Sequence, residues 1–337
     1  MCAPVRAALA AFVLSHADPA SAQVFESVGT RAQGMAGAFV GVADDATASW
    51  WNPAGLASGS YFNLVLERGR TTQPAEPGPD GPASRLTTSG FAVAFPALGA
   101  NFYRLQVAGI GPINPIAGGS EGRQPEGGAR SAHLLAVSQF GITVGQSMGD
   151  HLVVGSTLKI LRGGAIAADI DATGDGLDRA AALDPEGATR GDLDLGAMAR
   201  AGRFKAGLTL RNVTKPAFGD GSARISLVRQ ARAGLSLATA PVAAFETFVL
   251  AADADLSRTP TRFGDVRHAA AGVEAWLNGR RLGVRAGTST NTVGEARPSW
   301  STGVSVAPIR GLFIEASKTT GQDDTLAGWT TTLRFAF

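Results

Sequence analysis

Residues 329–337 read WTTTLRFAF, and this short stretch decides the class of fold to which the chain belongs. Its residues alternate, so that one face would be mainly apolar and the other mainly polar. The first face would carry Trp329, Thr331, Leu333, Phe335 and Phe337, and the second Thr330, Thr332, Arg334 and Ala336. Because successive side chains of a β-strand point to opposite sides, the stretch predicts a strand with two chemically different faces.

The same alternation recurs along most of the chain. In residues 204–212, FKAGLTLRN, Phe204 and Leu208 share one face, whereas Lys205 and Thr209 share the other. We predict fourteen strands of this kind, which lie at residues 60–69, 85–95, 99–109, 130–146, 151–162, 192–201, 203–212, 226–238, 245–256, 267–277, 281–289, 299–307, 311–318 and 328–337.

The connections between these strands alternate in length. A long segment, GRTTQPAEPGPDGPAS, is followed by the short PALGA, and the rhythm continues to give seven long and six short connections. In an up-and-down barrel consecutive connections lie at opposite rims, and outer-membrane barrels have short periplasmic turns and long external loops. A soluble β-sandwich is the alternative, but its Greek-key connections mix the two ends. The predicted fold is therefore all-β, a transmembrane antiparallel up-and-down β-barrel of about 14 strands.

The composition is compatible with such a barrel. Of the 337 residues 45% are hydrophobic, yet no uninterrupted apolar stretch reaches the roughly 20 residues that a membrane-spanning helix needs. The formal net charge is +2 without a basic run, so we expect no nucleic-acid partner. The polar strand faces suit a water-filled lumen, with the solvated face of a soluble sheet as the alternative. They include Lys159, Arg211, Asp253, Asp255, Glu274, Arg285, Glu315 and Arg334.

The N-terminus predicts export. Arg6 precedes an apolar run at residues 7–15, and the small residues at 20–22 form a cleavage site, so residues 1–22 read as a signal peptide. The alternative, a first apolar helix, would be interrupted by Pro19. The only cysteine, Cys2, lies inside this segment, and the mature chain would contain no disulfide. We expect a protein of the outer membrane of a Gram-negative bacterium, reached after passage through the inner membrane.

A different pattern precedes the first strand. Residues 30–57 read TRAQGMAGAFVGVADDATASWWNPAGLA. This block closely resembles the signature of the FadL/TodX-type outer-membrane transporters and their PorV-like relatives, in which R-A-x-G-M-x-G-A-F leads through A-D-D to W-N-P-A-G-L-A. The matching residues are Arg31, Gly34, Met35, Gly37, Ala38, Phe39, Asp44, Asp45, Trp51, Asn52, Pro53, Ala54, Gly55 and Leu56.

The resemblance implies that residues 23–59 form a small helical hatch inside the lumen of a barrel made by residues 60–337. The residue chemistry allows this. Acids suit the first turn of a short helix, and Asn52 can cap a second one with Pro53 at its first position. Gly34 and Gly37 would let the backbone lie close to a wall. A barrel of this strand number is wide enough to hold such an insert.

Paired acids inside a lumen need partners. We expect that Asp44 or Asp45 meets an arginine of the barrel; the alternative is a solvated helix cap. The candidate partners are Arg211, Arg285 and Arg334. At the other end of the chain, the terminal strand with Phe335 and Phe337 resembles the C-terminal signal that the outer-membrane assembly machinery reads.

The resemblance also implies a function, namely passive uptake of hydrophobic small molecules such as long-chain fatty acids across the outer membrane. The family releases its ligand through a lateral gap, which we expect near residues 101–109, and its other contact is membrane lipid. The external loops are modest for such a transporter. Two alternatives therefore stay open: a PorV-like docking or secretion protein with a secreted or surface partner, and a nonspecific porin.

Catalytic and metal chemistry find little support. Outside the export segment the histidines have no nearby Ser/Asp arrangement, so we predict no catalytic residue, no cofactor and no enzyme. These histidines are His133, His151 and His268. DATGDGLD at residues 171–178 superficially resembles a calcium loop. Thr173 replaces its second acid and Ala182 stands where a glutamate should close it, so we predict no metal site.

Overall fold

The computed structural model describes residues 28–74, 83–111, 130–170, 175–241, 244–261, 264–322 and 326–337. The predicted signal peptide at residues 1–22 lies outside these residues, as do residues 112–129. The boundaries of that peptide and of the hatch therefore stay predictions.

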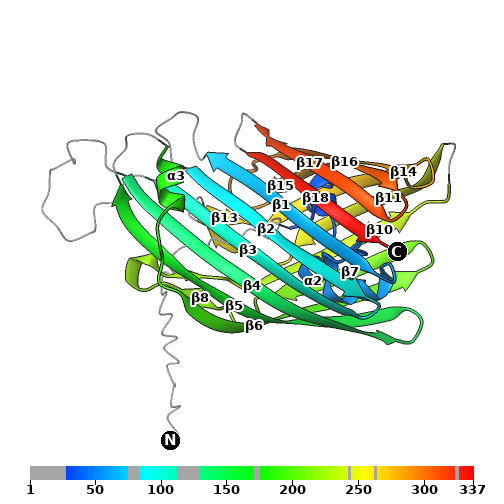
Figure 1. The fold of residues 1–337 in the computed structure, drawn as a ribbon, viewed down its shortest axis with the longest axis horizontal. Helices are drawn as coiled ribbons and strands as arrows, with labels where there is room; N and C mark the ends of the chain where they lie inside the picture. Colours follow the sequence, from blue (N-terminus) through cyan, green and yellow to red (C-terminus); the bar gives the residue numbers. More distant parts are fainter. Residues whose placement is uncertain are drawn as a thin grey trace, which may run out of the picture.

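Fourteen antiparallel strands close into a barrel, because β1 pairs with β18 as well as with β2 (Figure 1). The predicted fold class is confirmed. In wall order the strands are β1 (Asn63–Pro74), β2 (Ala83–Phe95), β3 (Leu98–Gly111), β4 (Arg130–Met148), β5 (Leu152–Ile170), β6 (Ala188–Ala201), β7 (Phe204–Arg211), β10 (Gln230–Ala238), β11 (Phe245–Asp255), β14 (His268–Leu277), β15 (Leu282–Asn291), β16 (Ser299–Ile309), β17 (Leu312–Gly321) and β18 (Ala327–Ala336).

The predicted strands and the observed ones differ mainly at their ends. β5 continues to Ile170, beyond the predicted residue 162, because it stays paired with β4 as far as Arg130. The predicted strand at 226–238 begins only at Gln230, since Ile225 and Ser226 belong to a separate small hairpin. The tight turns at the short rim use glycines with positive φ, such as Gly149 at 68°.

The long connections carry small elements of their own. They contain the hairpins β8 (Ala217–Phe218) with β9 (Ile225–Ser226) and β12 (Thr259–Thr261) with β13 (Gly264–Val266), the single turn η3 (Gly221–Ala223) and the helix α3 (Gly176–Ala181). Residues 171–174 of the calcium-like segment lie outside the described residues. Asp175 caps α3, and both Asp175 and Asp178 form ion pairs with Arg85 of β2.

The strand faces separate as the alternation predicts. On β18, Trp329 is 44% exposed on the outer wall, whereas Arg334 on the opposite face is only 6% exposed. The same holds around the barrel, where large apolar side chains such as Leu158, Leu208 and Val304 are exposed and Lys159, Thr209 and Ser305 are buried. No helix in the described part of the chain is long and apolar enough to cross a membrane.

The expected lateral gap near strand three is not present. β3 pairs with β2 from Leu98 to Ile110 and with β4 from Leu98 to Gly111, without a register shift. The expectation of an opening between Asn101 and Gly109 is therefore wrong for this structure. The Gly- and Pro-rich segment GIGPINPIAGG at residues 109–119, which follows the expected gap, begins inside the ladder, and only its residues from 112 onward lie outside the described residues.

Candidate functional site

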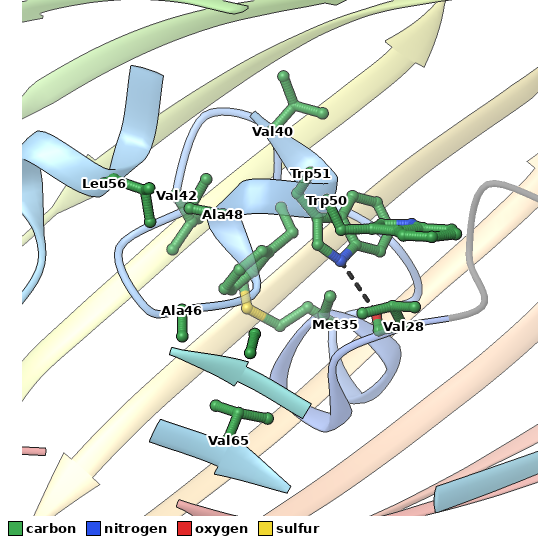
Figure 2. Packing of buried hydrophobic residues seen from close by; sticks show 14 of the residues in the cluster. Val28, Met35, Val40, Val42, Ala46, Ala48, Trp50, Trp51, Leu56 and Val65 are labelled. Carbon is green, nitrogen blue, oxygen red and sulfur yellow. Dashed lines mark hydrogen bonds between the residues drawn. The ribbon is translucent and has the colours of Figure 1, made fainter. Parts of the chain in front are cut away.

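Residues 28–59, called the hatch below, pack inside the barrel. They form α1 (Thr30–Gly34), α2 (Ala48–Trp51) and η2 (Pro53–Ser58), and the largest hydrophobic cluster of the described molecule is built around them. Figure 2 shows Trp50 and Trp51 side by side, with the Trp51 indole N–H donating to the Val28 carbonyl at 2.9 Å. Because both indoles are fully buried, the hatch is a packed core rather than a loose tail.

The Asn-Pro-Ala motif behaves as its chemistry predicts. Asn52 is extended, its Oδ1 accepts from the Ala54 N–H at 3.2 Å, and Pro53 occupies the first position of η2. The Asn52 Nδ2 donates to two backbone carbonyls, that of Val40 in the hatch and that of Ala197 on β6, both at 3.1 Å. A single buried amide therefore closes the hatch on itself and ties it to the barrel.

The paired acids lie just before α2 and not in its first turn. Asp45 accepts from the Thr47 N–H at 2.9 Å, which makes a turn that leads into the helix at Ala48. We expected these acids in the first turn of the helix, but they precede it, in the turn that leads to Ala48. Asp45 is buried, and a cation of the hatch itself compensates the charge of its other oxygen.

That cation is Arg31. Its Nη1 contacts Asp44 at 2.7 Å and Asp45 at 2.9 Å, and its Nη2 contacts Glu274 of β14 at 2.7 Å. The expected pairing of the acids with Arg211, Arg285 or Arg334 is therefore wrong. The hatch supplies its own counter-charge and shares it with one carboxylate of the wall.

The three barrel arginines compensate barrel carboxylates instead. Arg285 binds Glu274 at 2.6 Å. Arg334 binds Glu315 at 3.0 Å. Arg211 lies 3.4 Å from Asp194 and places its guanidinium 3.7 Å from the centre of the Trp50 ring. Arg211 thus reaches the hatch through an aromatic ring and not through an acid.

Barrel side chains also bind backbone amides of the hatch. Asp253 on β11 accepts from the N–H groups of Phe39 and Val40 at 2.9 and 2.7 Å. Glu67 on β1 accepts from the Gly29 N–H at 2.9 Å. These carboxylates satisfy donors in a loop that has no regular partners, so they hold the hatch at defined points of the wall.

The hatch rests on a series of glycines, which we call the glycine belt. A Cβ atom added at Gly155 would lie 2.5 Å from the carbonyl carbon of Pro53, and one added at Gly272 would lie 2.7 Å from the Met35 carbonyl oxygen. The belt comprises Gly155 on β5, Gly196 on β6, Gly207 on β7, Gly234 on β10, Gly272 on β14 and Gly287 on β15. Only residues without a side chain allow backbone to approach backbone so closely.

The predicted hatch glycines contribute on the other side of this contact. Gly34 lies against Gly303 of β16, where an added Cβ would be 3.1 Å from the Gly303 Cα. Gly37 has a φ of 87°, a left-handed conformation that disfavours other residues. The glycine belt itself was not predicted. In the sequence, each strand of the belt has a glycine at a position that faces the lumen. This pattern could not be interpreted without knowing that a folded segment fills the lumen.

One sector of the lumen is apolar. On the side of the hatch that faces the long connections, inward-facing side chains of β2 to β5 meet Leu227 of the connection between β7 and β10, and leave a void of only about 10 Å³. The lining residues are Leu86, Leu105, Val107, Leu135, Val137, Leu161 and Leu227. Phe218 and Ile225 of the β8–β9 hairpin belong to the same cluster. We call these nine residues the apolar sector. The sequence had indicated only polar strand faces that suit a water-filled lumen.

Solved structures of similar shape have this arrangement of barrel strands. A toluene transporter from Ralstonia pickettii, TbuX, is 13% identical, with a TM-score of 0.59, covering 93% of this chain and 99% of its own. The CymD monoaromatic hydrocarbon channel is 12% identical, with a TM-score of 0.63 and coverage of 94% and 99%. A FadL homologue from Pseudomonas aeruginosa is 11% identical, with a TM-score of 0.58 and coverage of 95% and 100%.

The chain has the FadL/TodX-type barrel fold. The fold and the hatch motif of the sequence thus point to the same group. Residues 131–255 also match a family model described as F plasmid transfer operon, TraF, protein, which covers less than half of the chain. A comparison of the sequence with curated proteins finds no match.

The charge state of Asp44 is open to a direct test. Burial opposes its ionisation, but the charges of Arg31 and Lys205 hold the pKa of Asp44 below its usual value. A depressed pKa in the folded state means that the Arg31–Asp44 contact stabilises the hatch above about pH 4 and ceases to do so as the pH falls through the lowered value. We expect carbon-13 NMR of labelled aspartate, assigned with Asp44→Asn, to give a midpoint below about 3.9. A midpoint at or above the usual aspartate value would contradict the contact.

Proposed function

We propose that the protein is an outer-membrane barrel for passive uptake of hydrophobic small molecules, held closed by its hatch. The observation that carries the proposal is the apolar sector, which lines the lumen beside the hatch. The toluene transporters and the hydrocarbon channel that share the fold support it. Export of the chain through the inner membrane belongs to the same proposal, as does recognition of Phe335 and Phe337 by the assembly machinery.

The structure suggests how such a ligand would enter. Leu227 and the β8–β9 hairpin cover the apolar sector from the external side, and the void beneath them is smaller than any ligand. A hydrophobic molecule would have to displace these side chains and take over their contacts with β2 to β5. This exchange changes the free energy of apolar burial very little, since one apolar partner replaces another. Passage then requires movement of the hatch, because the backbone of the hatch lies directly against the wall at the glycine belt.

We expect Leu161→Asn to reduce uptake about tenfold, because it places an amide in the middle of the apolar sector. The measurement is entry of labelled toluene or fatty acid into liposomes that contain the purified barrel. Thr330→Asn is the matched control, since Thr330 also faces the lumen but lies on β18, away from the apolar sector. Equal uptake by the two variants would argue against the apolar sector as the ligand path.

A docking role is the second candidate. Residues 131–255 match a family model described as an F plasmid transfer operon protein, and this description names no small-molecule substrate. The liposome experiment separates the two candidates. Absence of uptake by the unaltered protein, together with a surface protein that purifies with it, would favour docking. A nonspecific porin agrees poorly with a lumen that contains the buried hatch. We infer no catalytic role.

A further inference from the structure

The outer wall of the barrel is chemically asymmetric. The outward positions of β7, β10, β14, β15, β16 and β18 hold no charged residue over the described strands. On β1 to β5, by contrast, exposed arginines stand on the outer face, and the strands themselves place no acid there. The acids near this face, Asp175 and Asp178 of α3, are paired with Arg85 of β2. The most prominent of the exposed arginines are Arg68 and Arg70 on β1, Arg104 on β3 and Arg162 on β5.

Three of these arginines form a row across five strands. The pairing registers join Arg68 to Ser89, Ser89 to Arg104, Arg104 to Ser138 and Ser138 to Arg162. We call these five residues the arginine row. Neighbouring strands are about 4.8 Å apart, so consecutive arginines of the row stand about 10 Å apart with a serine between them. In the described part of the chain none of the three is in an ion pair.

The arginine row borders the apolar surface of the wall. The next outward positions toward the short-turn rim hold exposed apolar side chains on all five strands, again in direct register. They are Leu66, Phe91, Phe102, Phe140 and Ile160. β1 runs from the short-turn rim toward the rim of the long connections (Figure 1). Arg68 follows Leu66 along this strand, so it lies on the external side of Leu66.

A tryptophan marks a membrane interface at the level of Arg70 on β1, one outward position beyond Arg68 of the arginine row. Trp329 on β18 is exposed on the outer wall and directly opposes Arg70 on one side and Lys318 on the other. Tryptophan favours the boundary between hydrocarbon and headgroups. Arg68 of the row opposes Thr331, one outward position nearer the short-turn rim than Trp329. An arginine there can extend its long side chain toward the headgroups while its methylenes remain against lipid.

We propose that the arginine row binds the phosphate groups of an anionic lipid in the external leaflet. Guanidinium groups pair with phosphate through two parallel hydrogen bonds, and the serine hydroxyls between them supply further donors. The exposed aromatic side chains just below would lie against the acyl chains. A lipid with two phosphates would be held by two neighbouring arginines. The site lies outside the lumen, and it rests on the proposed function only for the membrane location.

Native mass spectrometry of the full chain tests this site. The probes are lipid A, enzymatically dephosphorylated lipid A, and inorganic phosphate as a competitor. The test variant carries Arg68→Gln, Arg104→Gln and Arg162→Gln. The matched control carries Arg203→Gln, Arg281→Gln and Arg310→Gln, which remove the same charge from exposed positions on the short turns. Both should keep the heat-modifiable mobility of the folded barrel on a gel, which shows that assembly is unaffected.

We expect the unaltered protein and the control to prefer lipid A over its dephosphorylated form, and the test variant to bind lipid A about 100-fold more weakly. Each arginine beside anionic headgroups contributes about a fivefold factor, and three of them act together. Equal binding by test and control variants would overturn the proposal. So would displacement of lipid A by millimolar inorganic phosphate, which would indicate a simple anion site. A barrel that transports toluene without binding lipid A would separate this failure from that of the proposed function.

Discussion

Gly196→Val is expected to dislodge the hatch and turn a closed barrel into a conducting pore. A Cβ at this position would meet Asn52 and Pro53, and Pro53 Cδ would be 2.8 Å away. These atoms belong to a rigid turn, so the hatch has to move as a whole. Overpacking of this kind costs about 3 kcal/mol, enough to raise the population of the displaced hatch roughly 100-fold. The measurement is conductance across a planar bilayer.

Gly191→Val is the matched control for that experiment. Gly191 lies on the same strand, β6, and an added Cβ there would meet no atom within 4 Å. It therefore reports any general effect of valine on the strand. If both variants stay closed while they fold, the hatch does not depend on the glycine belt. If both conduct equally, the effect comes from the strand and not from the contact with Asn52.

Arg31→Met is expected to destabilise the docked hatch by about 3–5 kcal/mol, because it leaves buried carboxylates without their shared cation. Asp44 and Asp45 lose their only ion-pair partner among the described residues, whereas Glu274 keeps Arg285 at 2.6 Å. Thiol labelling of a cysteine introduced at Ala54, in a chain with Cys2 replaced by serine, measures how often the hatch becomes accessible. The labelling rate should rise at least 100-fold.

Two further variants make the Arg31 result specific. Adding Asp44→Asn and Asp45→Asn to Arg31→Met should recover much of the protection, since the unpaired charges are then removed. Arg297→Met breaks an exposed pair with Glu295 and should change the labelling rate less than fivefold, as surface pairs contribute little. If Arg31→Met labels no faster than Arg297→Met, the network around Arg31 does not hold the hatch.

The candidate site shows which kinds of contact the sequence could predict. Asn52 and Pro53 act within a few residues of themselves, so their cap was predictable from chemistry that is local to the motif. The partners of Asp44 and Asp45 were not. Arg31 is close in the sequence but belongs to α1, and its choice over Arg285 or Arg334 depends on how α1 turns toward β14. Spacing alone carries no such information.

The sequence by itself determined the barrel, because alternation with a period of two and the rhythm of long and short connections are properties of consecutive residues. It placed fourteen strands and the approximate position of every tight turn. Only the tertiary structure decided what the strands contain and what they present to lipid. The glycine belt, the apolar sector and the arginine row each join residues of separate strands through register. Register is set by the closure of the whole wall, so it cannot be read from any single segment.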